Sequence, residues 1–229
     1  MTHRTGPGAS PGGAPGAGAG APSFAVPLPL DGGLSAQLAA AGREPGGELW
    51  TAAALLDAPE ALIAAHGAFL AAGARILLTA SYQASRRGLA RRGLSAREAD
   101  EAIARSVRLA RAAVAARPAG GEPAWVAGSI GPYGAVLGGG AEYRGRYGLG
   151  AGELERFHRP RLAALAAAGP DLIALETLPD QDEGAVLLRM VPELGLPVWV
   201  SWTIDGPRTR DGRPMEEAFA LAAGVPGVV

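Results

Sequence analysis

The sequence predicts an α/β fold built from repeated strand–helix units, of the kind that closes into a parallel barrel. Five short apolar runs each end in a polar or glycine cluster: Leu28–Asp31, Ile76–Ser81, Trp125–Ser129, Leu172–Glu176 and Val198–Ser201. Strands that are buried on both faces of a parallel sheet read apolar throughout, as these runs do. The residues Asp31, Thr79, Ser129 and Glu176 recur at separations of 48, 50 and 47 positions, and each gap is wide enough for a helix. Because the active site of a parallel barrel lies where strands end, these polar residues are the first candidates for chemistry.

Helix signals fall between the apolar runs. Sequences typical of a capped helix start occur at three places: Asp57–Glu60, Ser95–Glu98 and Asp180–Glu183. In each of them a capping residue is followed three positions later by a glutamate, and an amphipathic run comes next. Another helix is predicted over 154–165 and is expected to end at Gly169, with Pro160 kinking or dividing it.

Residues 131–150 follow the third apolar run and contain many glycines and three tyrosines. Loops this long are uncommon without a task, so the segment predicts an ordered functional loop over the open face of the barrel. A plain connector is the alternative that composition leaves open.

Composition predicts one domain, residues 23–229, preceded by a disordered tail of residues 1–22 that is rich in Gly, Pro and Ala. A net charge of −1 and a pI near 6.3 argue against a general role on nucleic acids or membrane surfaces. The chain has no cysteine. Neither a signal peptide nor a membrane span is evident, so the expected location is the cytoplasm.

Several motifs in order along the chain resemble the homocysteine S-methyltransferases, a family of zinc-dependent barrels. They are LDGGLSAQL at 30–38, LLTASYQAS at 77–85, VAGSIGPYGA at 126–135, EYRGRYG at 142–148, FHRPR at 157–161 and ALETLPD at 174–180. The similarity extends from about residue 27 to residue 229. It implies an eight-stranded (β/α)8 barrel of the TIM type, of which this sequence supplies about five strand–helix units. The motifs TASYQA and GSIGPYGA are most similar to the branch that uses S-methylmethionine or S-adenosylmethionine as the methyl donor.

The resemblance also implies a reaction. A methyl group passes from a sulfonium donor to the thiol of homocysteine, giving methionine, and the thiolate is the competent nucleophile. A free thiol with a pKa near 8.5 is only slightly ionised at neutral pH. The family uses zinc held by three cysteines to bind homocysteine as the thiolate. In the family those cysteines come after the point where this sequence stops, so we expect the 229 residues alone to bind no zinc and to be inactive.

Two carboxylates are implied to receive the ammonium group of homocysteine: Asp31 and Glu176. Glu176 ends an apolar strand, where a buried carboxylate is costly without a cationic partner. A nearby arginine is the alternative partner for it. Asp31, followed by two glycines, has the alternative role of a turn and helix-capping residue.

The carboxylate group of the substrate is implied to contact the amide of Gly32 and the side chain of Thr79, with Ser81 and Tyr82 lining the pocket. Thr79 and Ser81 have a simpler alternative, which is to satisfy backbone groups. Ser129 and Tyr133 are interpreted as loop architecture, and the histidines are not expected to bind metal.

Three functional hypotheses remain at this point. The first is the N-terminal part of a homocysteine S-methyltransferase, complemented by a separate C-terminal chain if the protein is split. The second is a non-catalytic remnant that binds an amino acid or a partner protein. The third is a barrel hydrolase that pairs Glu176 with another carboxylate such as Asp205.

Overall fold

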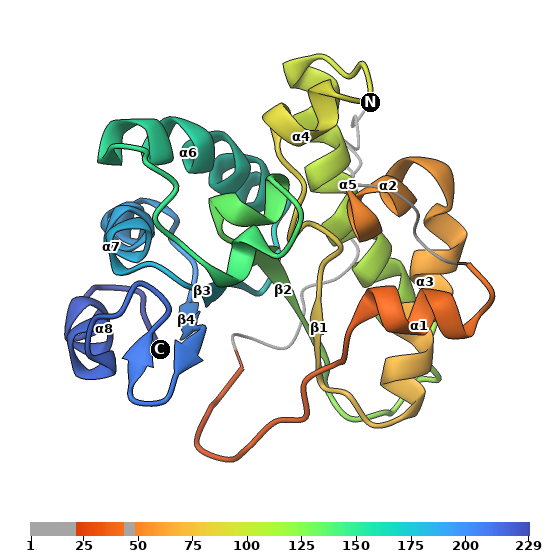
Figure 1. The fold of residues 1–229 in the computed structure, drawn as a ribbon. Helices are drawn as coiled ribbons and strands as arrows, with labels where there is room; N and C mark the ends of the chain where they lie inside the picture. Colours follow the sequence, from red (N-terminus) through yellow and green to blue (C-terminus); the bar gives the residue numbers. More distant parts are fainter. Residues whose placement is uncertain (1–21, 44–48) are drawn as a thin grey trace, which may run out of the picture.

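The computed structural model describes residues 22–43 and 49–229 (Figure 1). Except for the buried Pro22, the predicted tail of residues 1–22 lies outside the described residues, so its disorder stays a prediction.

The centre of the molecule is a parallel sheet with strand order β1-β2-β3-β4. The strands are β1 Ile76–Leu78, β2 Trp125–Ile130, β3 Leu172–Leu178 and β4 Val198–Trp202. At one edge Leu30 forms a single parallel bridge to Ile76, and at the other edge Val228 forms one to Val198. Sequential strands are therefore neighbours throughout, as in a barrel wall, which confirms the predicted fold class. The expected first strand, 28–31, is wrong in extent, because one bridge is all that it forms.

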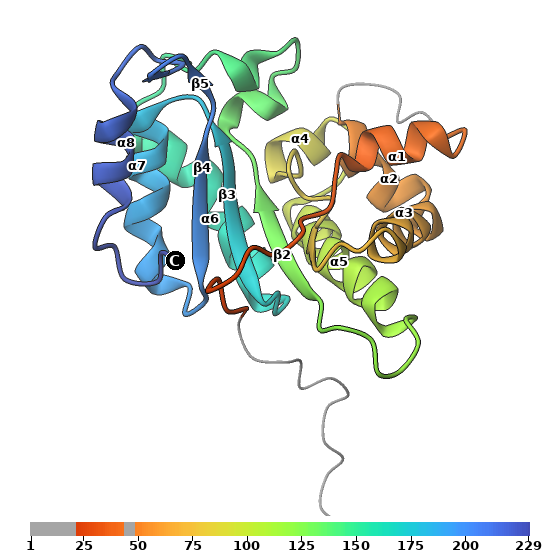
Figure 2. The same ribbon diagram turned by 90° about the horizontal axis from the view of Figure 1, so that it is seen from below.

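Helices surround the sheet as an outer arc (Figures 1 and 2). They are α1 Leu34–Ala40, α2 Trp50–Asp57, α3 Pro59–Ala71, α4 Arg86–Ala90, α5 Ala96–Ala115, α6 Ala151–Ala167, α7 Gln181–Met190 and α8 Met215–Ala222. Short 3-10 turns occur at η1 Tyr133–Val136, η2 Ala141–Tyr143 and η3 Val191–Glu193, and a small antiparallel hairpin pairs β5 Ile204–Asp205 with β6 Arg208–Thr209. Among the described helices, none has the length and apolar character needed to cross a membrane.

Both faces of β1, β2 and β3 are largely buried, as the apolar runs predict. Strand β4, at the edge of the sheet, is only partly buried, so the expectation of burial on both faces is wrong for it. Leu77 and Val126 belong to the core between the sheet and the helices, and Leu165 of α6 contributes from the helix side. Ile76 and Leu172 point the other way, into a small cluster on the inner face of the sheet. Adjacent positions of β1 thus serve two different hydrophobic clusters, which explains why no polar residue alternates within it.

The predicted helix starts have three different outcomes. Ser95 and Glu98 form the full capping box at α5, which confirms that prediction. The box at Asp57 is wrong: Asp57 is the last residue of α2, it pairs with Arg92, and Ala58 occupies the cap of α3. At α7, Asp180 caps the helix by accepting a hydrogen bond from the Asp182 N–H. The capping box is incomplete, because Glu183 does not accept a hydrogen bond from the backbone of Asp180.

Helix α6 continues through Pro160 without interruption. Of the two effects expected of Pro160, division of the helix is therefore wrong, and a kink stays a prediction. The helix ends at Ala167, and the following Gly169 adopts a left-handed conformation with φ of 70°, as predicted for a helix stop.

Buried His66 on α3 predicts acid sensitivity. Burial lowers the pKa of His66 to about 4, and neither ring nitrogen has a hydrogen-bond partner among the described residues. The imidazole of His66 binds a proton near pH 6.5 in the unfolded chain but only near pH 4 in the folded chain. The free energy of unfolding is therefore unaffected by this group above pH 6.5 and decreases as the pH falls toward 4. We expect a loss of about 2–3 kcal/mol in unfolding free energy between pH 7 and 4.5 from this group.

The measurement is urea unfolding of the wild type and of His66→Leu at both pH values. Other buried groups titrate in the same range, so the double difference between the two proteins isolates His66. An equal pH-dependent loss in both proteins would contradict the prediction.

Candidate functional site

The carboxyl ends of β1, β2 and β3 bring the predicted site residues to one edge of the sheet. A chain of hydrogen bonds links them. The Ser129 N–H donates to Thr79 Oγ1 at 2.9 Å, and the Ser81 hydroxyl donates to the Ser129 carbonyl at 2.8 Å. The Ser129 hydroxyl in turn donates to Glu176 Oε1. Ser129 is thus the centre of the connection, and the interpretation of it as mere loop architecture underestimates it.

Thr79 has its hydroxyl fully engaged in this network. Its oxygen accepts from Ser129, and it lies 2.7 Å from Ser81 Oγ, whose own hydrogen is given to a carbonyl. The Thr79 hydrogen must therefore point to Ser81. For Thr79 to donate to a substrate carboxylate, this bond has to be exchanged for the one to the ligand.

Asp31 enters the site from the segment that bridges to β1. Its Oδ2 accepts the Leu78 N–H at 2.9 Å, whereas Oδ1 is buried without a partner among the described residues. Burial raises the pKa of Asp31 to about 7, and the negative charge of Glu176 adds to the shift. The backbone N–H of the neighbouring Gly32 has no hydrogen-bond partner in the described part of the chain. A Cβ at Gly32 would lie 3.0 Å from the ring of Phe69. This corner thus presents an unpartnered acceptor beside a free donor.

An irregularity in β3 determines the position of the Glu176 side chain. The register between β3 and β4 shifts between Leu175 and Leu178, and Thr177 has φ of 61°. A left-handed conformation is unfavourable for a β-branched residue and persists only where its surroundings hold it. Here the Thr177 N–H donates to Ser201 and its carbonyl accepts from Thr203. Burial also raises the pKa of Glu176, so the site holds two desolvated carboxylates whose charges repel.

Tyr82 packs its ring on the backbone of the loop after β2. A Cβ at Gly131 would lie 2.6 Å from that ring, so glycine is required for this close approach. The Tyr82 hydroxyl lies close to the side chain of Thr177 and to Glu176, at the end of β3. All six predicted residues lie at the same rim of the sheet.

The loop of residues 131–150 is ordered, and it covers this rim (Figure 2). Its two 3-10 turns, η1 and η2, bury Tyr133 and Glu142. The ring of Tyr133 lies 5.4 Å from that of Tyr147 and 4.8 Å from that of Phe157 on α6. An ordered loop over the strand ends is what the sequence predicts.

Behind the rim, Arg161 ties the strand-end loops together. This α6 side chain has no exposed surface. Its Nε donates to the carbonyl of Ala84 at 2.7 Å, Nη2 to that of Tyr82 at 2.7 Å, and Nη1 to that of Gly131 at 3.0 Å. One guanidinium thus holds the loop after β1 and the loop after β2 in fixed relation. The motif FHRPR contains this residue, but nothing in the sequence assigns it this contact.

A buried histidine and glutamate complete that cluster. His158 Nε2 lies 2.7 Å from Glu183 Oε1, and Nη1 of Arg161 lies 3.4 Å from His158 Nδ1. Burial and the charge of Arg161 lower the pKa of His158, so the ring is neutral and Nε2 is the donor. The Tyr133 N–H also donates to Glu183. These hydrogen bonds explain why the Glu183 side chain does not complete the capping box of α7.

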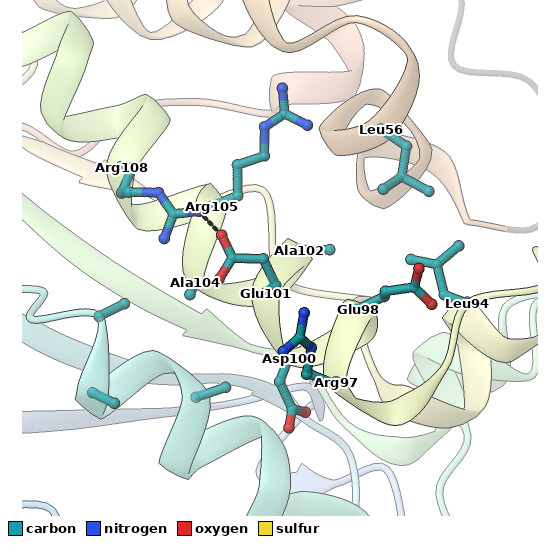
Figure 3. A pocket seen from close by; sticks show the side chains of 13 residues that line it. Leu56, Leu94, Arg97, Glu98, Asp100, Glu101, Ala102, Ala104, Arg105 and Arg108 are labelled. Carbon is teal, nitrogen blue, oxygen red and sulfur yellow. Dashed lines mark hydrogen bonds and ion pairs between the residues drawn. The ribbon is translucent and has the colours of Figure 1, made fainter.

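A separate groove of about 1120 Å³ lies on the outer helix layer (Figure 3). It runs along α5 beside Leu56 and Ala164, and Arg108 and Glu101 form an ion pair in it. None of the rim side chains lines this groove, so it is distinct from the strand-end site.

The third functional hypothesis receives no support from Asp205. Its side chain is 78% exposed and pairs with Arg210 at 3.1 Å. Within the described ranges, no group of three His, Cys, Asp or Glu side chains is placed to hold a metal ion.

Comparison with known proteins identifies close relatives of the whole described region. The family model for homocysteine S-methyltransferase matches residues 28–229. A homocysteine S-methyltransferase of Escherichia coli K12 is 42% identical over 210 residues, which cover 88% of this chain and 67% of the relative. Homocysteine S-methyltransferase 4 of Zea mays is 41% identical over 212 residues, covering 87% of this chain and 62% of the relative. The chain thus spans about two thirds or less of the length of these relatives.

Among solved structures, the metallated form of the homocysteine methyltransferase MmuM from Escherichia coli superposes with a TM-score of 0.83. The sequence identity is 40%, and the match covers 90% of this chain and 74% of that chain.

Proposed function

Because the chain belongs to the homocysteine S-methyltransferase family, we propose that its strand-end site binds homocysteine and that the protein serves methyl transfer from a sulfonium donor to give methionine. The proposed methyl donor is S-methylmethionine or S-adenosylmethionine, and the proposed location is the cytoplasm. The observation that carries the proposal is the pair of desolvated carboxylates, Asp31 and Glu176, at one rim.

The electrostatics of that pair favour an ammonium group. Burial raises the pKa of both carboxyl groups, so each is destabilised as an anion in the unliganded chain. An ammonium group between them relieves this cost by charge and by hydrogen bonds. Gly32 N–H lies next to Asp31 and supplies a donor for the carboxylate of the same amino acid, and Thr79 supplies a second after its bond to Ser81 is exchanged. The side chain of the bound amino acid is thereby held in one orientation at the rim.

Zinc supplies thiolate activation in this family, but the donor set of this chain does not fit that ion. There is no cysteine among the 229 residues, and the unpartnered rim oxygen of Asp31 is a hard donor suited to an ammonium group. We propose that these residues supply the amino-acid half of the site, and that a complementing C-terminal chain would have to supply the thiolates.

The proposal is tested by calorimetry and metal analysis on the 229-residue chain. We expect L-homocysteine to bind, butanethiol without the amino-acid group not to bind, and zinc to be far below one equivalent with no methyl transfer. Equal binding of butanethiol, or stoichiometric zinc, would overturn the proposal. Binding of homocysteine that does not compete with methionine would favour the alternative, a non-catalytic amino-acid-binding protein.

A further inference from the structure

Glu142 is a buried carboxylate with one oxygen that has no hydrogen-bond partner among the described residues. It lies on η2 with 2% of its surface exposed, and its Oε2 is buried without a hydrogen bond among the described residues. Burying an unpaired carboxylate costs several kcal/mol relative to water. Such a group needs a reason to be kept, and a ligand is one.

The position of Glu142 relates it to the rim. Turn η2 packs against β3, the strand that ends in Glu176 (Figures 1 and 2). Burial is the main reason that the pKa of Tyr82 is raised, and the charges of Glu176 and Glu142 and the hydroxyl of Tyr143 add to it. The Tyr82 hydroxyl is therefore within electrostatic range of both carboxylates. Glu176 lies at the rim within a network of hydrogen bonds. Glu142 lies in the loop that covers the rim and is outside that network.

We propose that Glu142, together with the rings of Tyr82 and Tyr143, forms a second subsite that binds the sulfonium group of the methyl donor. This inference rests on the proposed function, because it assigns the second substrate of the same site.

The surroundings of Glu142 suit a sulfonium group better than they suit an ammonium group. A sulfonium carries a full positive charge but no N–H or O–H, so it is recognised by a negative charge and by aromatic faces without matched hydrogen bonds. In the described part of the chain, Oε2 of Glu142 has no hydrogen-bonding neighbour. Asp31 and Glu176, in contrast, lie among N–H and O–H groups and suit an amino-acid headgroup.

The subsite also distinguishes donor from product. In the transfer, the thiolate sulfur of homocysteine forms a bond to the methyl carbon, and the old carbon–sulfur bond breaks. Its electron pair stays on the donor sulfur, which becomes a neutral thioether. The attraction to Glu142 is then lost, which favours product release.

The test uses small probes on the 229-residue chain. Trimethylsulfonium carries the charge without an amino-acid group, and dimethyl sulfide is its neutral counterpart. We expect NMR titration to show binding of trimethylsulfonium only, weakened at least tenfold by Glu142→Gln. The matched control, Glu60→Gln, removes an exposed charge on α3 and is expected to change nothing. Homocysteine binding should stay within twofold in both variants.

Stability gives an independent readout. If Glu142 is an unpartnered ligand-binding carboxylate, Glu142→Gln raises the melting temperature of the unliganded chain. A structural carboxylate would lower it. Tyr143→Leu, at a half-exposed position, provides a second variant and should weaken trimethylsulfonium but not homocysteine.

Three results would overturn the inference: no binding of trimethylsulfonium to the wild type, unchanged binding in Glu142→Gln, or an equal loss of homocysteine binding. If homocysteine fails to bind while trimethylsulfonium binds in a Glu142-dependent way, the proposed function fails and the cation subsite stands.

Discussion

Replacing Arg161 with methionine is expected to lower the free energy of unfolding by about 3–5 kcal/mol, the size measured when one partner of a buried charge network is removed. The variant leaves the carbonyls of Tyr82, Ala84 and Gly131 without their donor in a site that water does not reach. Burial raises the pKa of Glu183 to about 8, and the charge of Arg161 opposes that shift, so the variant raises this pKa further. Urea unfolding at pH 7 measures the effect.

A neighbour on the same helix provides the control. Arg159 pairs with Glu155 and Glu193, but its side chain is 47% exposed. Exposed pairs contribute little, so Arg159→Met should cost less than about 1 kcal/mol. Arg161→Lys keeps the charge without the planar fork and should recover only part of the loss. Equal effects of the methionine variants at 159 and 161 would contradict the assignment.

Glu176→Gln is expected to weaken homocysteine binding by about 10- to 100-fold, because a hydrogen bond to a charged group contributes about 1.5–3 kcal/mol. The amide still accepts from Ser129 but no longer neutralises the ammonium. Calorimetry at pH 8 measures the change. The matched control is Asp182→Gln, a change at an exposed position of α7 where no loss is expected.

The pH dependence of the same titration has a defined sign. Burial raises the pKa of Asp31 to about 7 in the unliganded chain, and the proposed contact with an ammonium group requires the ionised form. Affinity should therefore rise as the pH increases through 7, by about tenfold between pH 6 and pH 8. Asp31→Asn should bind more weakly and flatten this profile. A profile that remains equally steep in Asp31→Asn would show that another group titrates.

The sequence predicts the parts of this fold that depend on short-range patterns. Apolar runs identify β1 to β4, and Ser95 with Glu98 identifies the start of α5, because burial on both strand faces and capping act over a few residues. Asp57 has the same capping pattern, yet it ends α2. There Asp57 pairs with Arg92, which lies 35 positions away and outside the four-residue motif, and Ala58 takes the cap position of α3.

The candidate site likewise has a part that short-range patterns predict and a part that depends on contacts between distant residues. The spacing of the strand ends is enough to bring Asp31, Thr79 and Glu176 to one rim, since parallel strands end on one side. The bonds that organise the rim join residues far apart in sequence, such as Ser129 to Glu176 and Arg161 to Tyr82. Polar residues with several available partners do not reveal their choice in advance. Glu142 could have been suspected only as a charge within a loop rich in glycine and tyrosine.

The left-handed Thr177 makes ligand affinity a reporter of sheet assembly. Its backbone is held by Ser201 and Thr203, which belong to β4 and the residue after it. If β4 detaches, Thr177 relaxes toward an ordinary extended conformation, and the carboxylate before it turns away. Binding of homocysteine at the proposed site should then be lost before global melting, in a molecule whose sheet edge has only frayed.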